Sequence, residues 1–212
     1  MCYYLLTIMK NNKYTNTINA YSKMGEEYLK VTSNLLPPGL DDFLKLIPKN
    51  GLALDVGCAG GRDSKRLVKA GLRVVGIDVV NAFLKYAKKN VPEAKFKKMD
   101  VTKLNFSDDT FDVVLANAIL LHLRKKDVSV VLKNLYRVLK VGGKIFIGVK
   151  QGKGISYKTD KLSNEKRMFI YYEESEISKI IKESGFKIIF SNVCEDGAGR
   201  SDTKWIVVVA EK

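Results

Sequence analysis

Three carboxylates follow one local pattern, in which a segment predicted to be a strand contains the acid or directly precedes it. Asp55 lies in the run Leu52–Val56, Asp78 follows residues 72–77, and Asp100 follows residues 94–99. In parallel α/β sheets, ligands bind at the carboxyl ends of strands, and an acid there can accept hydrogen bonds from sugar hydroxyls. Asp78 is the strongest candidate for that role. Its alternative role is to cap the helix predicted to follow.

The residues after Asp55 form a turn of small side chains, Gly-Cys-Ala-Gly-Gly at 57–61. Small residues let the backbone approach a ligand closely, and the N-terminus of the following helix favours a carboxylate or phosphate. The dinucleotide fingerprint Gly-x-Gly-x-x-Gly does not match, because Ala59 and Arg62 take two of its glycine positions. We expect the Ala59 methyl group to fit on a backbone of negative φ. The competing interpretation is an ordinary turn at the start of a helix.

His122 is the single histidine of the chain, and its titration near neutral pH makes it a candidate base for a hydroxyl, thiol or amine. The alternative is a packed and hydrogen-bonded histidine, since leucines surround it in the sequence. The cysteines Cys2, Cys58 and Cys194 are scattered, which argues against a disulfide framework and against a zinc site. We therefore expect no bound metal and a cytoplasmic location.

The chain is strongly basic, with 37 lysines and arginines against 23 acidic residues and a net charge of +14. A basic surface can attract nucleic acid or acidic substrates. The lysines are spread along the chain instead of gathering with aromatics in one stripe, so a nucleic-acid partner is the less favoured alternative. No run approaches the ~20 apolar residues of a membrane span. Met1–Met9 lacks the features of a signal peptide, and Met9 is an alternative start.

The apolar periodicity predicts a regular alternation of strands and helices. Strands are expected over 52–56, 72–77, 94–99, 111–116, 144–149, 187–192 and 204–210, and helices over 15–36, 41–47, 63–70, 81–90, 127–139 and 173–184. This order predicts an α/β fold, a Rossmann-like open sheet of seven strands, mostly parallel with an antiparallel last strand, and helices on both faces. Residues 150–167 are interpreted as a loop on the substrate side. We expect one domain, with 1–48 as a helical lid segment and 49–212 as the ligand-binding part.

In this order and at these spacings, the motifs resemble class I S-adenosylmethionine-dependent methyltransferases. The resemblance rests on an acid two residues before a compressed glycine turn, with Ala59 in the middle glycine position, and on the acids after the second and third strands. It covers about residues 15–212 and implies S-adenosyl-L-methionine as cofactor and S-adenosyl-L-homocysteine as product. It implies the methionine carboxylate near 57–61, the ribose at Asp78 and the adenine at Asp100 and Val101. The cofactor-binding residues that it implies are Tyr21, Asp55, Gly57, Cys58, Ala59, Gly61, Arg62, Asp78, Val79, Asp100, Val101, Asn117 and Ala118.

The activity implied by the resemblance is transfer of a methyl group by in-line displacement. We expect a small-molecule acceptor and a monomer or homodimer with no membrane partner. The alternatives are an RNA methyltransferase acting on transfer RNA, and a protein that binds adenosylmethionine without turnover. Tyr21 is expected nearest the methyl donor, its alternative being a core contact. The residues expected to bind the acceptor are Lys150, Arg167, Tyr171, Tyr172 and Arg200.

Overall fold

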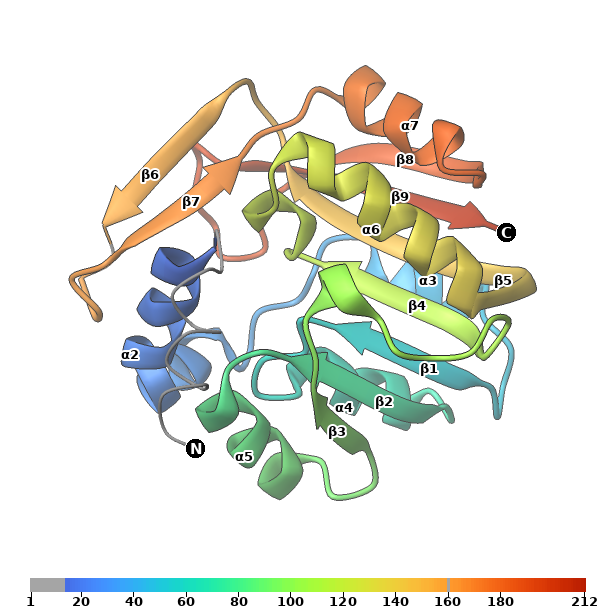
Figure 1. Cartoon of the computed structure of the whole chain (residues 1–212), viewed down its shortest axis with the longest axis horizontal. Helices are drawn as coiled ribbons and strands as arrows, with labels where there is room; N and C mark the ends of the chain where they lie inside the picture. Colours follow the sequence, from blue (N-terminus) through green and yellow to red (C-terminus); the bar gives the residue numbers. More distant parts are fainter. Residues whose placement is uncertain (1–13, 160) are drawn as a thin grey trace.

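A seven-stranded sheet with strand order β3-β2-β1-β4-β5-β9-β8 runs through the centre of the computed structural model, which describes residues 14–159 and 161–212 (Figure 1). Its strands are β1 (Leu52–Val56), β2 (Arg73–Asp78), β3 (Lys95–Lys98), β4 (Phe111–Asn117), β5 (Leu139–Lys150), β8 (Lys187–Glu195) and β9 (Lys204–Glu211). Only β9 runs against its neighbours β5 and β8 in this sheet. The predicted fold class is confirmed. The expectations for Met1–Met9 and Cys2 lie outside the described residues.

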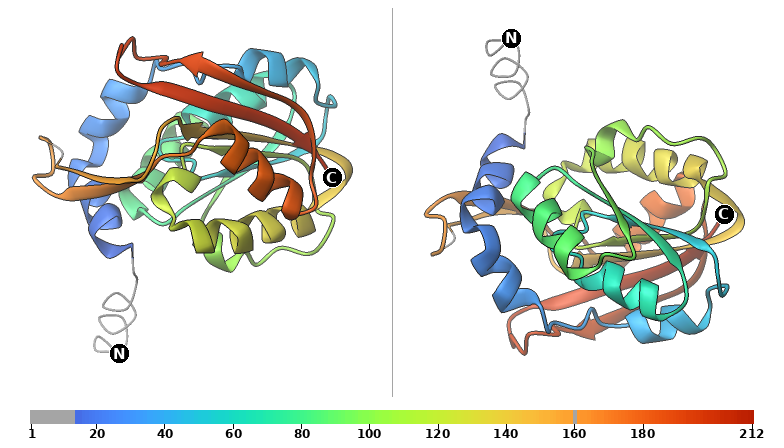
Figure 2. Two further views of the ribbon diagram at one scale, coloured as in Figure 1. Left: turned by 90° about the horizontal axis from the view of Figure 1, so that it is seen from above. Right: turned by 90° about the horizontal axis from the view of Figure 1, so that it is seen from below.

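Helices cover both faces of the sheet (Figure 2). The helices are α2 (Thr15–Thr32), α3 (Leu40–Lys45), α4 (Arg62–Lys69), α5 (Asn81–Asn90), α6 (Lys125–Val138) and α7 (Glu174–Glu183), with 3₁₀ turns at η1 (Val101–Lys103) and η2 (Leu120–His122). Apolar residues of α6 and α7 pack on one face, and those of α3, α4 and α5 on the other. The central strands β1 and β4 are buried on both faces, which is why they read as continuous apolar runs. No helix in the described part of the chain is both long and apolar enough to cross a bilayer.

The predicted loop over 150–167 is wrong. Residues Ile155–Thr159 (β6) and Lys166–Ile170 (β7) pair as a separate antiparallel hairpin. The hairpin lies beside α2 beyond the ends of the central strands (Figure 1). Its sequence lacks a clean apolar alternation because β6 is almost entirely exposed, and the usual signal for a half-buried strand is therefore absent.

The helix predicted over 15–36 ends earlier, at Thr32, and is interrupted at Gly25, whose φ of 50° and ψ of −138° are non-helical. Strand β5 begins at Leu139, before the predicted Lys144, and its pairing with β4 is irregular near Phe111. Of the predicted lid segment, only α2 lies over the site described below. Helix α3 packs on the sheet, where Phe43 is fully buried and its ring centroid lies 5.5 Å from that of Phe146.

Candidate functional site

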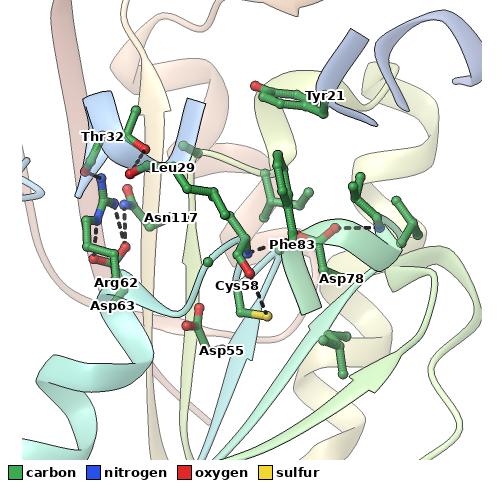
Figure 3. Close-up of a pocket in the computed structure, with 18 of the residues that line it drawn as sticks. Tyr21, Leu29, Thr32, Asp55, Cys58, Arg62, Asp63, Asp78, Phe83 and Asn117 are labelled. Atoms are coloured by element: carbon green, nitrogen blue, oxygen red, sulfur yellow. Dashed lines mark hydrogen bonds and ion pairs between the residues drawn. The ribbon is translucent and has the colours of Figure 1, made fainter. Parts of the chain in front are cut away.

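A cavity of about 460 Å³ opens at the carboxyl ends of β1, β2, β3 and β4, with α2 on its outer side (Figure 3). Ligand sites of α/β proteins form at this edge because parallel strands end there together. The predicted residues that line it are Tyr21, Asp55, Gly57, Cys58, Ala59, Arg62, Asp78, Val79, Asp100, Val101, Asn117, Ala118 and His122. Gly61 does not line the cavity. It stands at the start of α4 with a φ of 80°, and an added Cβ would meet Val91 at 3.2 Å and Phe96 at 3.3 Å.

The small-residue turn is tied to the end of β2 by backbone hydrogen bonds. The N–H groups of Gly57 and Cys58 both donate to the carbonyl of Ile77, at 2.8 and 3.0 Å. Ala59 has a φ of 44°, so the expected negative φ is wrong. The left-handed conformation costs an L-residue about 1–2 kcal/mol. It persists because the Ala59 N–H donates to the Asp78 carboxylate at 3.0 Å, which fixes the turn.

Asp78 and Asp100 keep carboxylate capacity for a ligand. Each Asp78 oxygen accepts one backbone N–H, from Ala59 at 3.0 Å and from Val80 at 2.9 Å. A carboxylate oxygen accepts two hydrogen bonds, so each retains a second position. Burial raises the pKa of Asp78, and the N–H groups act against that rise. Asp100 uses one oxygen for both the N–H and the hydroxyl of Thr102, each at 2.8 Å, and its other oxygen has no hydrogen bond among the described residues.

A buried network beneath the turn connects β1, α4 and β4. The hydroxyl of Ser64 donates to Asp55 at 2.6 Å, and burial together with the nearby charge of Asp63 raises the pKa of Asp55 to about 7. Asp63 receives two hydrogen bonds from Arg62, at 2.8 and 2.7 Å, and one from Asn117 at 3.1 Å. The sequence analysis missed Asp63 and Ser64, although both stand in the first turn of the helix that follows the glycine turn.

Aromatic side chains form the outer wall of the cavity. Tyr28 stacks on Phe83 with ring centroids 5.7 Å apart, and Tyr21 meets both rings edge-on, at 5.2 and 6.1 Å. Tyr28 and Phe83 were not predicted. Tyr28 lies seven residues after Tyr21, two turns along a helix, and this spacing could have indicated that both face one side.

A chain of hydrogen bonds joins the hairpin, α2 and η2 across this wall. Arg167 donates to the Tyr21 hydroxyl at 3.2 Å, and that hydroxyl lies 2.8 Å from Nε2 of His122. Nδ1 of His122 lies 2.7 Å from the carbonyl oxygen of Met168. A carbonyl only accepts, so Nδ1 carries the proton and Nε2 accepts from Tyr21. Both ring nitrogens of His122 are thus engaged by the protein.

The predicted base His122 is buried beside its aromatic neighbours. Burial lowers its pKa to about 4, and the positive charges of Arg167 and Lys150 act in the same direction. The imidazole is therefore neutral at physiological pH. Its lone pair is directed at the Tyr21 hydroxyl, and it is Tyr21 that the arrangement orients.

None of the five residues expected to bind the acceptor lines the cavity. Tyr172 is fully buried in the main core, away from any ligand surface. Tyr171 contacts Ser156 within the hairpin, its hydroxyl 3.1 Å from the serine hydroxyl. The cations Lys150, Arg167 and Arg200 lie around Phe169 and Trp205, on the hairpin side of the Tyr21–His122 pair.

Residues 54–147 of the chain match a family described as a methyltransferase domain. The matched segment holds the glycine turn, both strand-end acids and His122. The fold agrees, since a SAM-dependent methyltransferase from Methanosarcina mazei superposes with a TM-score of 0.73 over 84% of this chain and 98% of that one, at 22% identity. Residues 54–147 thus carry a methyltransferase domain, and the chain has the fold of S-adenosylmethionine-dependent methyltransferases.

Two further proteins show how far the likeness to methyltransferases reaches. A demethylmenaquinone methyltransferase of Streptomyces avermitilis is 37% identical over 94 residues, which are 44% of this chain and 40% of that protein. A Burkholderia thailandensis 1,6-didemethyltoxoflavin-N1-methyltransferase, solved with S-adenosylhomocysteine bound, has a TM-score of 0.64 over 97% of this chain and 80% of that one, at 17% identity. The chain spans between 40% and 52% of the length of the first three curated relatives that it matches.

Proposed function

We propose that the chain transfers a methyl group from S-adenosyl-L-methionine to a small-molecule acceptor, releasing S-adenosyl-L-homocysteine. The observation that carries this proposal is the pair of strand-end acids on one cavity, each with acceptor capacity to spare. Asp78 can accept two further hydrogen bonds, and one oxygen of Asp100 is free of described partners. A nucleoside with paired ribose hydroxyls and an exocyclic amino group supplies the donors that these two acids lack.

The shape of the turn fits the same ligand. An added Cβ at Gly60 would stand 2.9 Å from Leu29, and one at Gly57 would stand 3.0 Å from Ile119, so the backbone lies close under the cavity wall. The N–H of Val101 has no described partner in the protein, and it follows Asp100 directly. We assign the adenine amino group to Asp100, a ring nitrogen to the Val101 N–H, and the ribose to Asp78.

When bound, S-adenosyl-L-methionine supplies a methyl group on an already activated sulfonium. The protein then has to position the acceptor and exclude water, and such orientation can contribute several kcal/mol. Helix α2 covers the cavity and is held on the hairpin side by Tyr21 and by Thr17, whose hydroxyl accepts from the Met168 N–H at 3.1 Å. The neutral His122 keeps the Tyr21 hydroxyl directed, and we infer a positioning role for this histidine.

A small acceptor is favoured over RNA by the names of the relatives. The names of several relatives refer to demethylmenaquinone, to phosphoethanolamine and to ubiquinone biosynthesis. The RNA alternative is supported by the overall positive charge of the chain alone. We retain the cytoplasm as the proposed location, because Cys58 and Cys194 are free thiols and these persist in reducing compartments.

The test is calorimetric titration with S-adenosylmethionine and S-adenosylhomocysteine, with and without bulk transfer RNA. We expect binding that is indifferent to RNA. Asp78→Asn should bind about 10- to 100-fold more weakly, because a hydrogen bond to a charged group contributes ~1.5–3 kcal/mol. Asp42→Asn is the matched control, since Asp42 is an exposed carboxylate that pairs with Lys45 at 2.7 Å. Donor affinity that RNA increases and salt abolishes would favour the RNA alternative. Unchanged affinity in Asp78→Asn would refute the assignment.

A further inference from the structure

Lys150 is a buried cation without a counter-ion. It ends β5, where only 8% of the residue is exposed, and no ion pair or hydrogen bond of its ammonium occurs within residues 14–159 and 161–212. Its described contacts are with aromatic faces, with Nζ 4.5 Å from the ring centroid of Phe169 and 6.0 Å from that of Trp205. Lysine is almost never buried this far unless it is paired, because removing the charge from water costs several kcal/mol.

Three of the charged neighbours that act on Lys150 are cations, and one, Asp196, is a carboxylate. Arg167 places its guanidinium carbon 5.2 Å from the Phe169 centroid, on the same ring that Lys150 contacts. Burial, together with the charges of Arg200, Lys158 and Arg167, lowers the pKa of Lys150 to about 8, and the charge of Asp196 acts against this shift. The nearby carboxylate, Asp196, is already occupied by two hydrogen bonds from Arg200, at 2.9 and 2.7 Å, and one from the Trp205 indole at 2.7 Å.

This cationic cluster adjoins the wall of the cavity. Phe169 lies between the two, because its ring centroid is 5.0 Å from that of His122, which lines the cavity. Arg167 reaches from the cluster to the Tyr21 hydroxyl on the same wall. An anion near Lys150 would therefore lie on one side of Phe169, with His122 and the cavity on the other side.

We propose that Lys150 binds a carboxylate or phosphate group of the methyl acceptor, with Phe169 and Trp205 as the apolar walls of that subsite. That the anion belongs to the methyl acceptor rests on the proposed methyl transfer. Anion binding at Lys150 can be tested without it. An anion would supply the missing counter-charge, and a charge-assisted hydrogen bond is about twice as strong as a neutral one. The deep position of Lys150 suits a small anion better than the backbone of a nucleic acid.

The probes are inorganic phosphate and acetate, titrated separately while the unfolding midpoint and the calorimetric heat are recorded. We expect saturable binding of at least one of them to the wild-type protein, and the stronger of the two identifies the acceptor as a phosphate or a carboxylate. Lys150→Met should weaken this binding about tenfold or more, whereas Lys150→Arg should retain it. Lys179→Met is the control, because Lys179 is 75% exposed on α7.

A second measurement keeps the inference testable if Lys150→Met does not fold. In protein labelled with ¹³C-lysine, the ε-methylene signal missing from Lys150→Arg belongs to Lys150, and the bound anion should shift it. Equal binding to wild type and Lys150→Met, an unshifted signal, or no saturable binding would overturn the inference. S-adenosylhomocysteine is titrated in parallel. Its failure to bind would defeat the proposed function and leave the result on Lys150 intact.

Discussion

Acidification should destabilise this protein through His122, and the size of the effect follows from the burial of the imidazole. Unfolding exposes a histidine with an ordinary pKa of 6.5, while the native pKa is lowered to about 4. Below pH 6.5 the unfolded chain takes up a proton that the native protein does not, so stability falls as the pH falls toward 4. Between pH 7 and about 5.5 this group alone should remove about 1.2 kcal/mol from the free energy of unfolding.

The protonation of Asp55 changes the stability in the opposite direction, so its contribution must be separated from that of His122. Its native pKa of about 7 lies above its ordinary value of 3.8, so the native protein takes up this proton first and gains stability over the same interval. The wild-type profile therefore mixes both groups. Urea unfolding of wild type and His122→Gln, each at pH 7 and 5.5, isolates the histidine, because the carboxylates are common to both proteins and the fixed cost of the substitution cancels.

Direct observation of the imidazole provides an independent check. The chain has one histidine, so its ring signals in an NMR titration need no assignment. We expect them to remain those of the neutral ring down to about pH 5. A midpoint near 6.5, or the same pH dependence of stability in wild type and His122→Gln, would refute the buried and doubly hydrogen-bonded geometry.

Three further predictions concern the wall and the turn. Tyr21→Phe leaves Nε2 of His122 buried without its donor and should cost about 1–3 kcal/mol in urea unfolding; a loss no larger than that of the exposed control Tyr157→Phe would contradict it. Ala59→Gly should stabilise the protein by up to about 1 kcal/mol, because Ala59 has a φ of 44°; a lower unfolding midpoint would count against this strain. Gly25→Ala should lower the free energy of unfolding by about 1–3 kcal/mol, because the backbone conformation of Gly25 excludes L-residues even though an added Cβ meets nothing within 4 Å. Equal stability of Gly25→Ala and the helix control Ser22→Ala would disprove this prediction.

The regular elements were predictable because their signals are local. The central strands β1 and β4 are short apolar runs, and the helix Asn81–Asn90 has the bounds that its periodicity predicts. The strand-end acids could be placed at one edge from topology alone, since parallel strands end on the same side. Their assignment to one particular ligand came from the resemblance to methyltransferases.

The hairpin, the break in α2 and the conformation of Ala59 needed the tertiary structure. Strand β6 is exposed and leaves no apolar pattern, and Gly25 reads as an ordinary helical residue until the two halves of α2 are seen to bend. The φ of Ala59 depends on a hydrogen bond to Asp78, nineteen residues away.

The charge states of His122 and Lys150 likewise depend on tertiary contacts, which the local sequence pattern does not indicate. His122 and Lys150 could be singled out as residue types capable of chemistry, and their charge states depend on what buries them. The imidazole is neutral because α2 and the hairpin enclose it and occupy both of its nitrogens. The ammonium of Lys150 lacks a counter-ion because Asp196 is bound to Arg200 and Trp205. Composition and periodicity thus determined the sheet and its ligand-binding edge, whereas desolvation by distant segments decided which of its side chains carry charge.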